Sequence, residues 1–286
     1  MPEGDTILRT AQALHRALAA GTVARFETAY AHLARTDTDR PIVGRTIESV
    51  TAHGKHLLIR FSGDLVLRTH MRMSGRWHVY RSGERWRAPA RAVRIVIGTA
   101  AAVAIALDVV DAGFIDGRRL ARVAPLADLG PDLLAERFDE GGAAARLRAC
   151  GAREIGEVLL DQRVLAGAGN VFKSEVLFVC GVHPRWHAGA LTDDQARAIV
   201  RTARRLLRAN VAAPPATAGA MRRTTGRLNP AERLWVYGRR GRPCRRCGSP
   251  IASDKQGVAA RSTFWCPRCQ PPSNAGRPLT PPPRPG

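Results

Sequence analysis

The chain has 286 residues, of which 45% are hydrophobic, so it can fill the core of one large domain or of a few small ones. This composition excludes a disordered or fibrous protein. The chain carries 45 Lys and Arg against 24 Asp and Glu, and this net charge of +21 predicts a polyanionic partner such as nucleic acid. A GC-rich genome is the alternative source of so many arginines, but it does not account for the scarcity of acidic residues.

The sequence predicts neither a membrane segment nor a signal peptide. The longest apolar stretch, 93–110, contains Arg94 and Asp108 and alternates in the manner of β-strands. The first residues, MPEGD, are acidic, whereas a signal peptide begins with basic residues followed by an apolar run. We therefore expect a cytoplasmic protein.

The first half of the chain reads as one helix followed by strands. Apolar residues recur at helical spacing between Asp5 and Ala20, with Asp5 as the expected N-cap and Gly21 as the expected end. From about Val43 to Ala124 the apolar residues alternate, and turns containing glycine separate the segments. These patterns predict a β-body behind a leading helix.

The second half is predicted to be helical. Gly130 and Pro131 interrupt the strand pattern, so we place a hinge at about 128–132. Helical patterns follow at 153–162, 170–181 and 192–210. In the last of them Thr192 and Gln195 have the spacing of a capping box.

Four of the six cysteines have the spacing of a zinc ribbon. Cys244 and Cys247 form one C-x2-C pair, and Cys266 and Cys269 form the other. Two such knuckles at the ends of a hairpin can supply four thiolates to one structural zinc ion, and two disulfides are the alternative. The remaining two, Cys150 and Cys180, are expected to be core residues.

The N-terminus offers a nucleophile. Removal of Met1 would expose Pro2 as a secondary amine, and an α-amino group with a pKa near 8 is partly neutral at pH 7. A position ahead of a helix N-terminus favours the neutral form further. Glu3 is a carboxyl beside that amine, suited to proton transfer. The alternative interpretation is that Pro-Glu merely leads into a helix.

Two loops contain residues that are suited to binding a phosphate group. Lys55 in HGKHLL follows a glycine turn at the start of a strand, although it could be an ordinary surface lysine. The loop GAGN, with Gly167, Gly169 and Asn170, opens a helix whose backbone N–H groups can bind an anion. A simple glycine-rich connection between helices is the alternative there.

Two turns supply further candidate residues for contacts with nucleic acid. Arg261 lies where the hairpin between the cysteine pairs should turn, and its guanidinium could hold two phosphate oxygens. Arg72 and Met73 lie on a turn between strands, where an apolar wedge and an arginine could replace a displaced base. Core packing is the alternative for Met73.

Together these motifs resemble one family, the DNA glycosylases comprising formamidopyrimidine-DNA glycosylase and endonuclease VIII. MPEGDT, HGKHLL, MSG, LGPDLL, LLDQRVLAGAGNVFKSEVL, VYGRRGRPCRRCG and RSTFWCPRCQ occur in the family's order between Met1 and Gln270. The resemblance implies an α+β multi-domain fold that binds double-stranded DNA in a cleft between its halves, as a monomer. The expected domains are a β-sandwich with a leading helix at 1–127, a helix-two-turns-helix domain at 132–232, a zinc ribbon at 235–270 and a disordered tail at 271–286.

The resemblance also implies a mechanism. Pro2 would attack the anomeric carbon of the damaged nucleotide while Glu3 supplies a proton, and the resulting imine would lead to β,δ-elimination. Lys55, Asn170 and Arg261 match the family's phosphate-holding positions.

Three departures bear on the branch of the family. Thr6 stands where the family often has Glu, and VVDAGFIDGRR replaces the DPRRF run of the formamidopyrimidine branch. The MPEGDT opening is closer to endonuclease VIII, whereas MSG is closer to the other branch. We favour the endonuclease VIII side, with oxidised pyrimidines as substrates in base excision repair.

Other functions stay open on the sequence alone. The chain could remove oxidised purines, or it could be a non-catalytic damaged-DNA-binding protein on the same scaffold, which Thr6 would permit. A zinc-ribbon transcription factor would leave the β-half and the Pro-Glu start unexplained.

Overall fold

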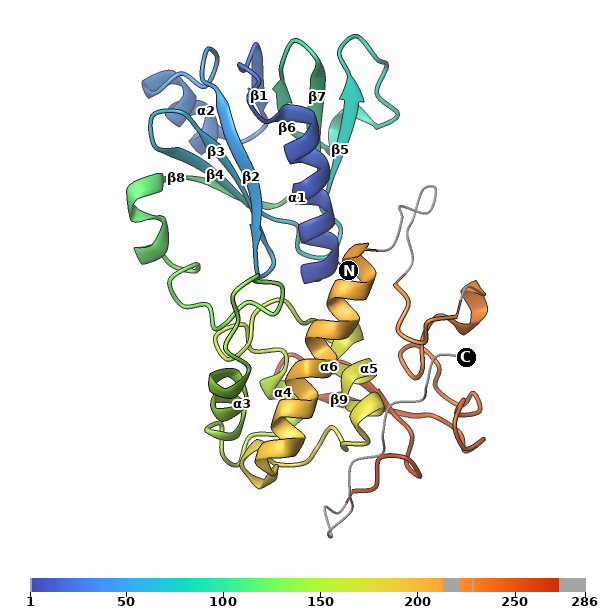
Figure 1. Cartoon of the computed structure of the whole chain (residues 1–286). Helices are drawn as coiled ribbons and strands as arrows, with labels where there is room; N and C mark the ends of the chain where they lie inside the picture. Colours follow the sequence, from blue (N-terminus) through green and yellow to red (C-terminus); the bar gives the residue numbers. More distant parts are fainter. Residues whose placement is uncertain (1, 213–221, 228, 273–286) are drawn as a thin grey trace. The chain divides into compact units, whose positions relative to one another are not determined.

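The computed structural model describes residues 2–212, 222–227 and 229–272 and divides after Asp128 into two compact units (Figure 1). No helix in these ranges is long and apolar enough to cross a membrane. The first unit contains α1 (Gly4–Leu18), β1 (Arg25–Thr28), α2 (Ala31–Asp39), β2 (Ile47–His53), β3 (His56–Phe61), β4 (Leu65–His70), β5 (Arg76–Arg81), β6 (Val93–Gly98), β7 (Ala102–Leu107) and β8 (Asp111–Asp116). Short 3-10 turns occur at Ala90–Ala92 and Gly117–Arg122.

The first unit is a β-sandwich with a leading helix, as predicted. Its two antiparallel sheets have the strand orders β1-β6-β7-β5 and β2-β3-β4-β8. Alternate residues of both sheets share one core with the buried face of α1, which includes Ile7 and Leu14. This burial follows from the period of two along a strand and 3.6 along a helix.

The ends of α1 differ from the prediction. Glu3, not Asp5, occupies the N-cap position, because the Glu3 carbonyl already accepts hydrogen bonds from the Thr6 and Ile7 N–H groups at 2.9 and 3.0 Å. Asp5 therefore lies inside the first turn and is buried. At the other end Ala20 takes the left-handed conformation expected of Gly21. Gly21 serves close packing instead, because a Cβ there would lie 2.9 Å from Thr99 Cγ2.

The second unit is helical, with a small hairpin at its end. It contains α3 (Glu140–Arg148), α4 (Ile155–Val158), α5 (Asn170–Cys180), α6 (Asp193–Ala212), β9 (Ala252–Gln256) and β10 (Arg261–Trp265), with 3-10 turns at Ala188–Ala190 and Pro230–Glu232. The capping box is present: Thr192 N donates to Gln195 Oε1 at 3.0 Å, and Gln195 N donates to Thr192 Oγ1 at 3.2 Å. The helix predicted at 153–162 is only the single turn α4. Gln162 ends this region by donating to the carbonyls of Leu160 and Ala168.

The cysteine region forms the predicted ribbon. Strands β9 and β10 pair antiparallel from Arg261 opposite Gln256 to Trp265 opposite Ala252. The first two residues of the predicted tail pack against the second unit, because Trp186 Nε1 donates to the carbonyls of Pro271 and Pro272 at 3.1 and 3.0 Å. The rest of that tail, 273–286, lies outside the described residues, as do residues 213–221 and 228.

Candidate active site and nucleic-acid contacts

The candidate catalytic pair lies at the start of α1. Glu3 is buried at 0% exposure, whereas the neighbouring Pro2 is partly exposed. Met1, whose removal would free the Pro2 amine, is outside the described residues. The N–H groups at the start of α1 point toward this end, so the helix dipole favours a neutral amine there.

The packing of α1 on β2 brings Lys55 to the same end of the unit. Ala20 N donates to the Ile47 carbonyl and Val50 N donates to His15 Nδ1, so helix and strand run in opposite directions. From Ala20 back to Glu3 the helix rises about 25 Å, and from Ile47 on to Lys55 the strand advances about 26 Å. The start of α1 and the β2–β3 turn that holds Lys55 therefore lie at one end of the first unit (Figure 1).

The register of the sheet β2-β3-β4-β8 brings two histidines and an aspartate together at that end of the first unit. His56 lies opposite His70, which lies opposite Asp111 on β8. The His56 and His70 rings meet edge to face with centroids 4.9 Å apart. Burial, together with His70 and Arg68, lowers the pKa of His56 to about 3. Burial, together with nearby arginines, lowers the pKa of His70 to about 4, so both imidazoles are neutral at pH 7.

The turn after β4 exposes both of its candidate residues, and one of them forms an ion pair. The Met73 side chain is 60% exposed, which rules out core packing; Met71 is the buried methionine. Arg72 adopts φ 51° and its Nη2 binds Asp111 Oδ2 at 2.8 Å. Asp111 also binds Arg68 at 2.5 Å, and although burial opposes it, these hydrogen bonds lower the pKa of Asp111.

In the second unit, Asn170 and Arg261 are neighbours. Gly169 caps α5 and Gly167 takes φ 104°, so the GAGN loop opens the helix as predicted. Asn170 Nδ2 donates to the Ser262 carbonyl at 2.8 Å, beside the exposed Arg261. Asn170 Oδ1 is buried and has no hydrogen-bond partner within the described residues.

Two buried residues of α5 hold this arrangement, and the sequence analysis missed both. The Lys173 ammonium, at 0% exposure, donates to Thr263 Oγ1 at 2.6 Å, which fixes α5 against β10. The Glu175 carboxylate accepts from three consecutive N–H groups, those of Trp235, Val236 and Tyr237, at 2.8–2.9 Å. The signal in the sequence is their place within an otherwise apolar helix, where a charge needs a buried partner.

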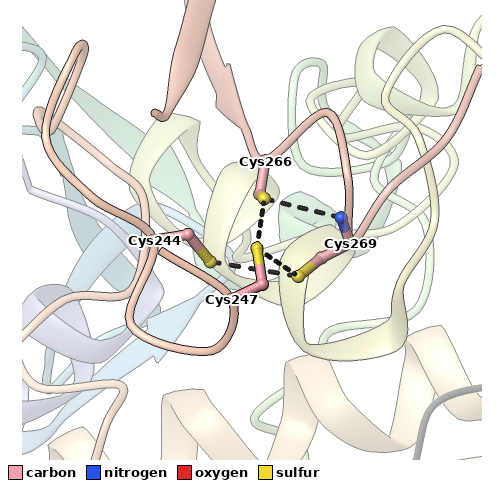
Figure 2. Close-up of side chains that lie close together, drawn as sticks. All are labelled: Cys244, Cys247, Cys266 and Cys269. Atoms are coloured by element: carbon pink, nitrogen blue, oxygen red, sulfur yellow. Dashed lines mark hydrogen bonds between the residues drawn. The ribbon is translucent and has the colours of Figure 1, made fainter. Parts of the chain in front are cut away.

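The four ribbon cysteines converge as a metal site requires (Figure 2). The Sγ atoms of Cys244 and Cys269 are 3.9 Å apart, and Cys247 Sγ lies 3.5 Å from Cys266 Sγ and 3.6 Å from Cys269 Sγ. A tetrahedral zinc ion with bonds of about 2.3 Å needs sulfur separations of about 3.8 Å. The four cysteines are not joined by disulfides, so the disulfide alternative was wrong.

The electrostatics of the cluster also fit a cation. Burial and the neighbouring thiols raise the pKa values of Cys266 and Cys269. Four thiolates so close together therefore need a positive charge to neutralise them. Of the other two cysteines, Cys180 is buried as predicted, whereas Cys150 is only partly buried against the core.

Three family models match the chain in the order of this architecture. The formamidopyrimidine-DNA glycosylase N-terminal domain matches residues 1–123, the H2TH domain of the same enzymes matches 129–220, and the zinc finger found in FPG and IleRS matches 241–272. The chain belongs to the formamidopyrimidine-DNA glycosylase/endonuclease VIII family. The third match and the four converging thiols identify one structural zinc site.

Among its relatives, those of the endonuclease VIII type are the more similar. The chain is 42% identical to "Probable endonuclease 8 2" of Streptomyces coelicolor, over all of this chain and 97% of that protein. It is 39% identical to "DNA-(apurinic or apyrimidinic site) lyase Nei2" of Mycolicibacterium smegmatis, over 94% and 99% of the two chains. Formamidopyrimidine-DNA glycosylase of Moorella thermoacetica is 35% identical over 88% and 92%. The predicted proximity to endonuclease VIII is confirmed.

A solved structure shares the fold. The formamidopyrimidine-DNA glycosylase of Lactococcus lactis, bound to DNA containing an AP site, superposes with a TM-score of 0.78 at 23% identity. The match covers 94% of this chain and 100% of that one. This similarity confirms the predicted fold class.

Proposed function

We propose that the protein is a bifunctional DNA glycosylase and AP lyase of base excision repair, acting through an imine on Pro2. The observation that carries the proposal is the start of α1: a buried Glu3 carboxyl beside a partly exposed Pro2, at the helix end that favours a neutral amine. The names of the relatives, which include an AP lyase and an endonuclease 8, support the same activity.

The chemistry follows from an amine nucleophile. The Pro2 nitrogen lone pair forms a bond to C1′, and the C1′–N bond to the damaged base breaks, with the electron pair leaving on the base. The proton that the Pro2 nitrogen loses neutralises the departing base, and the nitrogen lone pair is then free for the next step. A proton from Glu3 opens the sugar ring at O4′, which leaves an iminium between Pro2 and C1′. The iminium acidifies the C2′ proton; its loss expels the 3′ phosphate, and a second elimination expels the 5′ phosphate. One residue thus serves both lyase steps.

The remaining site residues are proposed to hold DNA. Lys55 in the first unit, and Asn170 with the GAGN glycines and Arg261 in the second, would bind backbone phosphates. The exposed Met73 would fill the space left by the displaced nucleotide, because apolar side chains on turns can enter the base stack. Arg72 would act beside Met73 only if its ion pair with Asp111 opens.

We further propose oxidised pyrimidines as the substrates, because the endonuclease VIII relatives have the higher identity. The proposed setting is the bacterial cytoplasm, where a monomer acts on the nucleoid; the organisms of the relatives support a bacterial origin.

Borohydride trapping tests the proposal. The full-length protein, with its N-terminal residue checked by mass spectrometry, is incubated with matched duplexes that carry an oxidised pyrimidine, 8-oxoguanine or an abasic site. We expect a covalent adduct through Pro2, and the strongest adduct with the oxidised pyrimidine. A stronger adduct with 8-oxoguanine would favour an oxidised-purine enzyme. Protein that starts at Pro2 and binds all three duplexes without forming an adduct would be a non-catalytic damage binder.

A further inference from the structure

The sheet β1-β6-β7-β5 is apolar on both faces. Every residue of β7 is buried, and alternate residues face opposite ways. Ala104 and Ala106 join the main core, whereas Val103 and Ile105 form a second cluster with Val96 of β6. An antiparallel sheet usually turns a polar face to water, so this second apolar face needs a cover.

The chain supplies that cover through its topology. Strands β5 and β6 both pair antiparallel with β7, so they run in the same direction. The connection 82–92 must therefore return along the length of the sheet, and Trp86 and Ala88 within it pack against the second cluster. This connection covers the face incompletely.

A pocket of about 720 Å³ remains between the connection and the sheet. Val93, Val96 and Val103 contribute its aliphatic surface, and Trp86 forms part of its wall. This volume is within the range of sites that enclose a small ligand or a few side chains, about 300–1,000 Å³. Arg25 lies over the Trp86 ring, 5.3 Å from its centroid.

The pocket lining has an excess of positive charge, with Arg25, Arg85 and Arg94 against Glu27 and Glu84. Residues 76–94 contain six arginines and one acidic residue. Of the two carboxylates at the pocket, Glu27 forms an ion pair with Arg25 at 2.7 Å, and Glu84 accepts a hydrogen bond from the Arg81 backbone N–H at 3.0 Å. The side chains of Arg85 and Arg94 also line the pocket, and neither forms an ion pair with any part of the chain that the structure describes.

We infer that this pocket docks an acidic peptide of a partner protein, with an apolar side chain of that peptide inserted as an anchor against Val96 and Val103. Arg85 and Arg94 would bind its carboxylates, and paired Arg and Trp are typical of residues that dominate peptide and protein binding. An aliphatic floor disfavours a nucleobase, whose polar edges would lose hydrogen bonds to water there.

The probe is a fluorescein-labelled peptide, GDEDFLDEG, titrated with the full-length protein and followed by fluorescence anisotropy. The control peptide GDEDSSDEG has the same charge and no anchor. We expect the first peptide to bind at least about tenfold more tightly, a difference of about 1.4 kcal/mol. Equal affinities would show general attraction to a protein of charge +21 and would overturn the inference.

Charge-reversal variants test whether the peptide binds at this pocket. The double variant Arg85→Glu/Arg94→Glu should weaken the anchored peptide about tenfold or more. The matched variant Arg87→Glu/Arg91→Glu, on the same connection but outside the pocket lining, should have little effect. Trp86→Ala should weaken the peptide without removing charge. Equal losses in the two double variants would contradict a specific site.

Abasic-site cleavage and oligonucleotide binding distinguish a peptide site from a catalytic or nucleic-acid site. Cleavage of an abasic duplex should be unchanged in the Arg85/Arg94 double variant, because neither residue belongs to the proposed catalytic or DNA-binding set. A fluorescein-labelled oligothymidine tests nucleic acid as the occupant. If the double variant weakened the oligonucleotide and left the peptide unaffected, the pocket would be a nucleic-acid site and the inference would fail.

Discussion

At the scale of single residues, the chemistry depends on where α1 begins. The Glu3 carbonyl starts the helix, and this places Pro2 one residue ahead of the first turn. A helix capped by Asp5, as the sequence analysis expects, would begin later and move the dipole's positive end away from Pro2. Thr6, which stands where the family often has a carboxylate, binds Asp5 Oδ1 through its hydroxyl at 3.3 Å. Glu3 is therefore the carboxyl adjacent to the proposed nucleophile.

The Pro2 amine itself can be tested by blocking it. An N-terminal extension that retains Met1 converts the amine to an amide, whose lone pair is delocalised and not nucleophilic. We expect no borohydride adduct and a loss of strand scission of at least about 10³-fold, since the covalent route is closed. Pro2→Gly keeps an amine without the ring and should slow scission strongly. DNA affinity, measured by anisotropy, should fall little in both, and preserved scission in the extended protein would refute the imine.

Glu3 is expected to matter more for base loss than for elimination. Glu3→Gln keeps the size of the buried side chain and removes its proton, so base excision should fall about 10²–10⁴-fold. Cleavage of a ready-made abasic site should fall less, because an abasic sugar opens to its aldehyde without a proton from Glu3 and has no base to expel. The ratio of the two rates on otherwise identical duplexes is the measurement. Equal losses would show that Glu3 is not specific to the glycosidic step.

At the scale of elements, the sequence predicted what local patterns determine. Alternation predicted the strands, the Thr192 and Gln195 spacing predicted the start of α6, and the cysteine spacing predicted the ribbon. It did not predict the tertiary contacts that override those patterns. Gln162 donates to the Ala168 carbonyl where the pattern predicts a continuing helix, and Trp186 donates to the carbonyls of Pro271 and Pro272 in the predicted tail. Such contacts join residues that no local window contains.

The same limit applies to the candidate site. The proposed phosphate ligands Lys55, Asn170 and Arg261 have local motifs, and they remain predictions until DNA binding is measured. Lys173 has no such motif, because its role depends on Thr263, which is distant in sequence. Asp111 likewise becomes visible only through the β4–β8 register, which places it opposite His70.

The proposed phosphate contact of Arg261, at the hairpin tip, can be tested by the salt dependence of DNA affinity. Arg261→Ala should weaken binding to lesion and undamaged duplexes alike, because a phosphate contact carries no sequence information. The slope of log affinity against log salt should decrease in magnitude by about one contact. Arg268→Ala, an exposed arginine of the same ribbon beyond β10, is the matched control and should leave the slope unchanged. An unchanged slope for Arg261→Ala would place the tip away from DNA.

The histidine cluster predicts a pH dependence of stability. The folded pKa of His56, about 3, lies below its ordinary value of 6.5, so its stabilisation is present above pH 6.5 and is lost as the pH falls toward 3. At pH 5 this one group should cost about 2 kcal/mol of unfolding free energy. Thermal melts at pH 7 and 5 should show a smaller loss for His56→Gln than for wild type, and His187→Gln, an exposed control, should behave as wild type. Identical losses in all three proteins would contradict a buried neutral His56.

At the scale of the whole molecule, two different forces hold the chain. The first unit buries a shared apolar core between two sheets and α1. The ribbon is built differently: it is a single pair of strands, β9 and β10, between two cysteine knuckles. A two-stranded hairpin is marginal in water by itself, so the ribbon depends on the metal and on its contacts with α5.

Zinc removal should therefore act on one part of the molecule. Structural zinc sites contribute about 10–16 kcal/mol of apparent binding free energy at pH 7, more than a small hairpin can replace. After chelation we expect the ribbon amides to lose protection from hydrogen exchange and those of the first unit to keep it. Affinity for an abasic duplex should fall about tenfold or more, since Arg261 and the β10 partner of Asn170 both belong to the ribbon. Cys269→Ser should reproduce the effect and Cys150→Ser, outside the cluster, should not. A chelated protein that keeps its ribbon protected and binds DNA normally would show that apolar packing alone holds the ribbon.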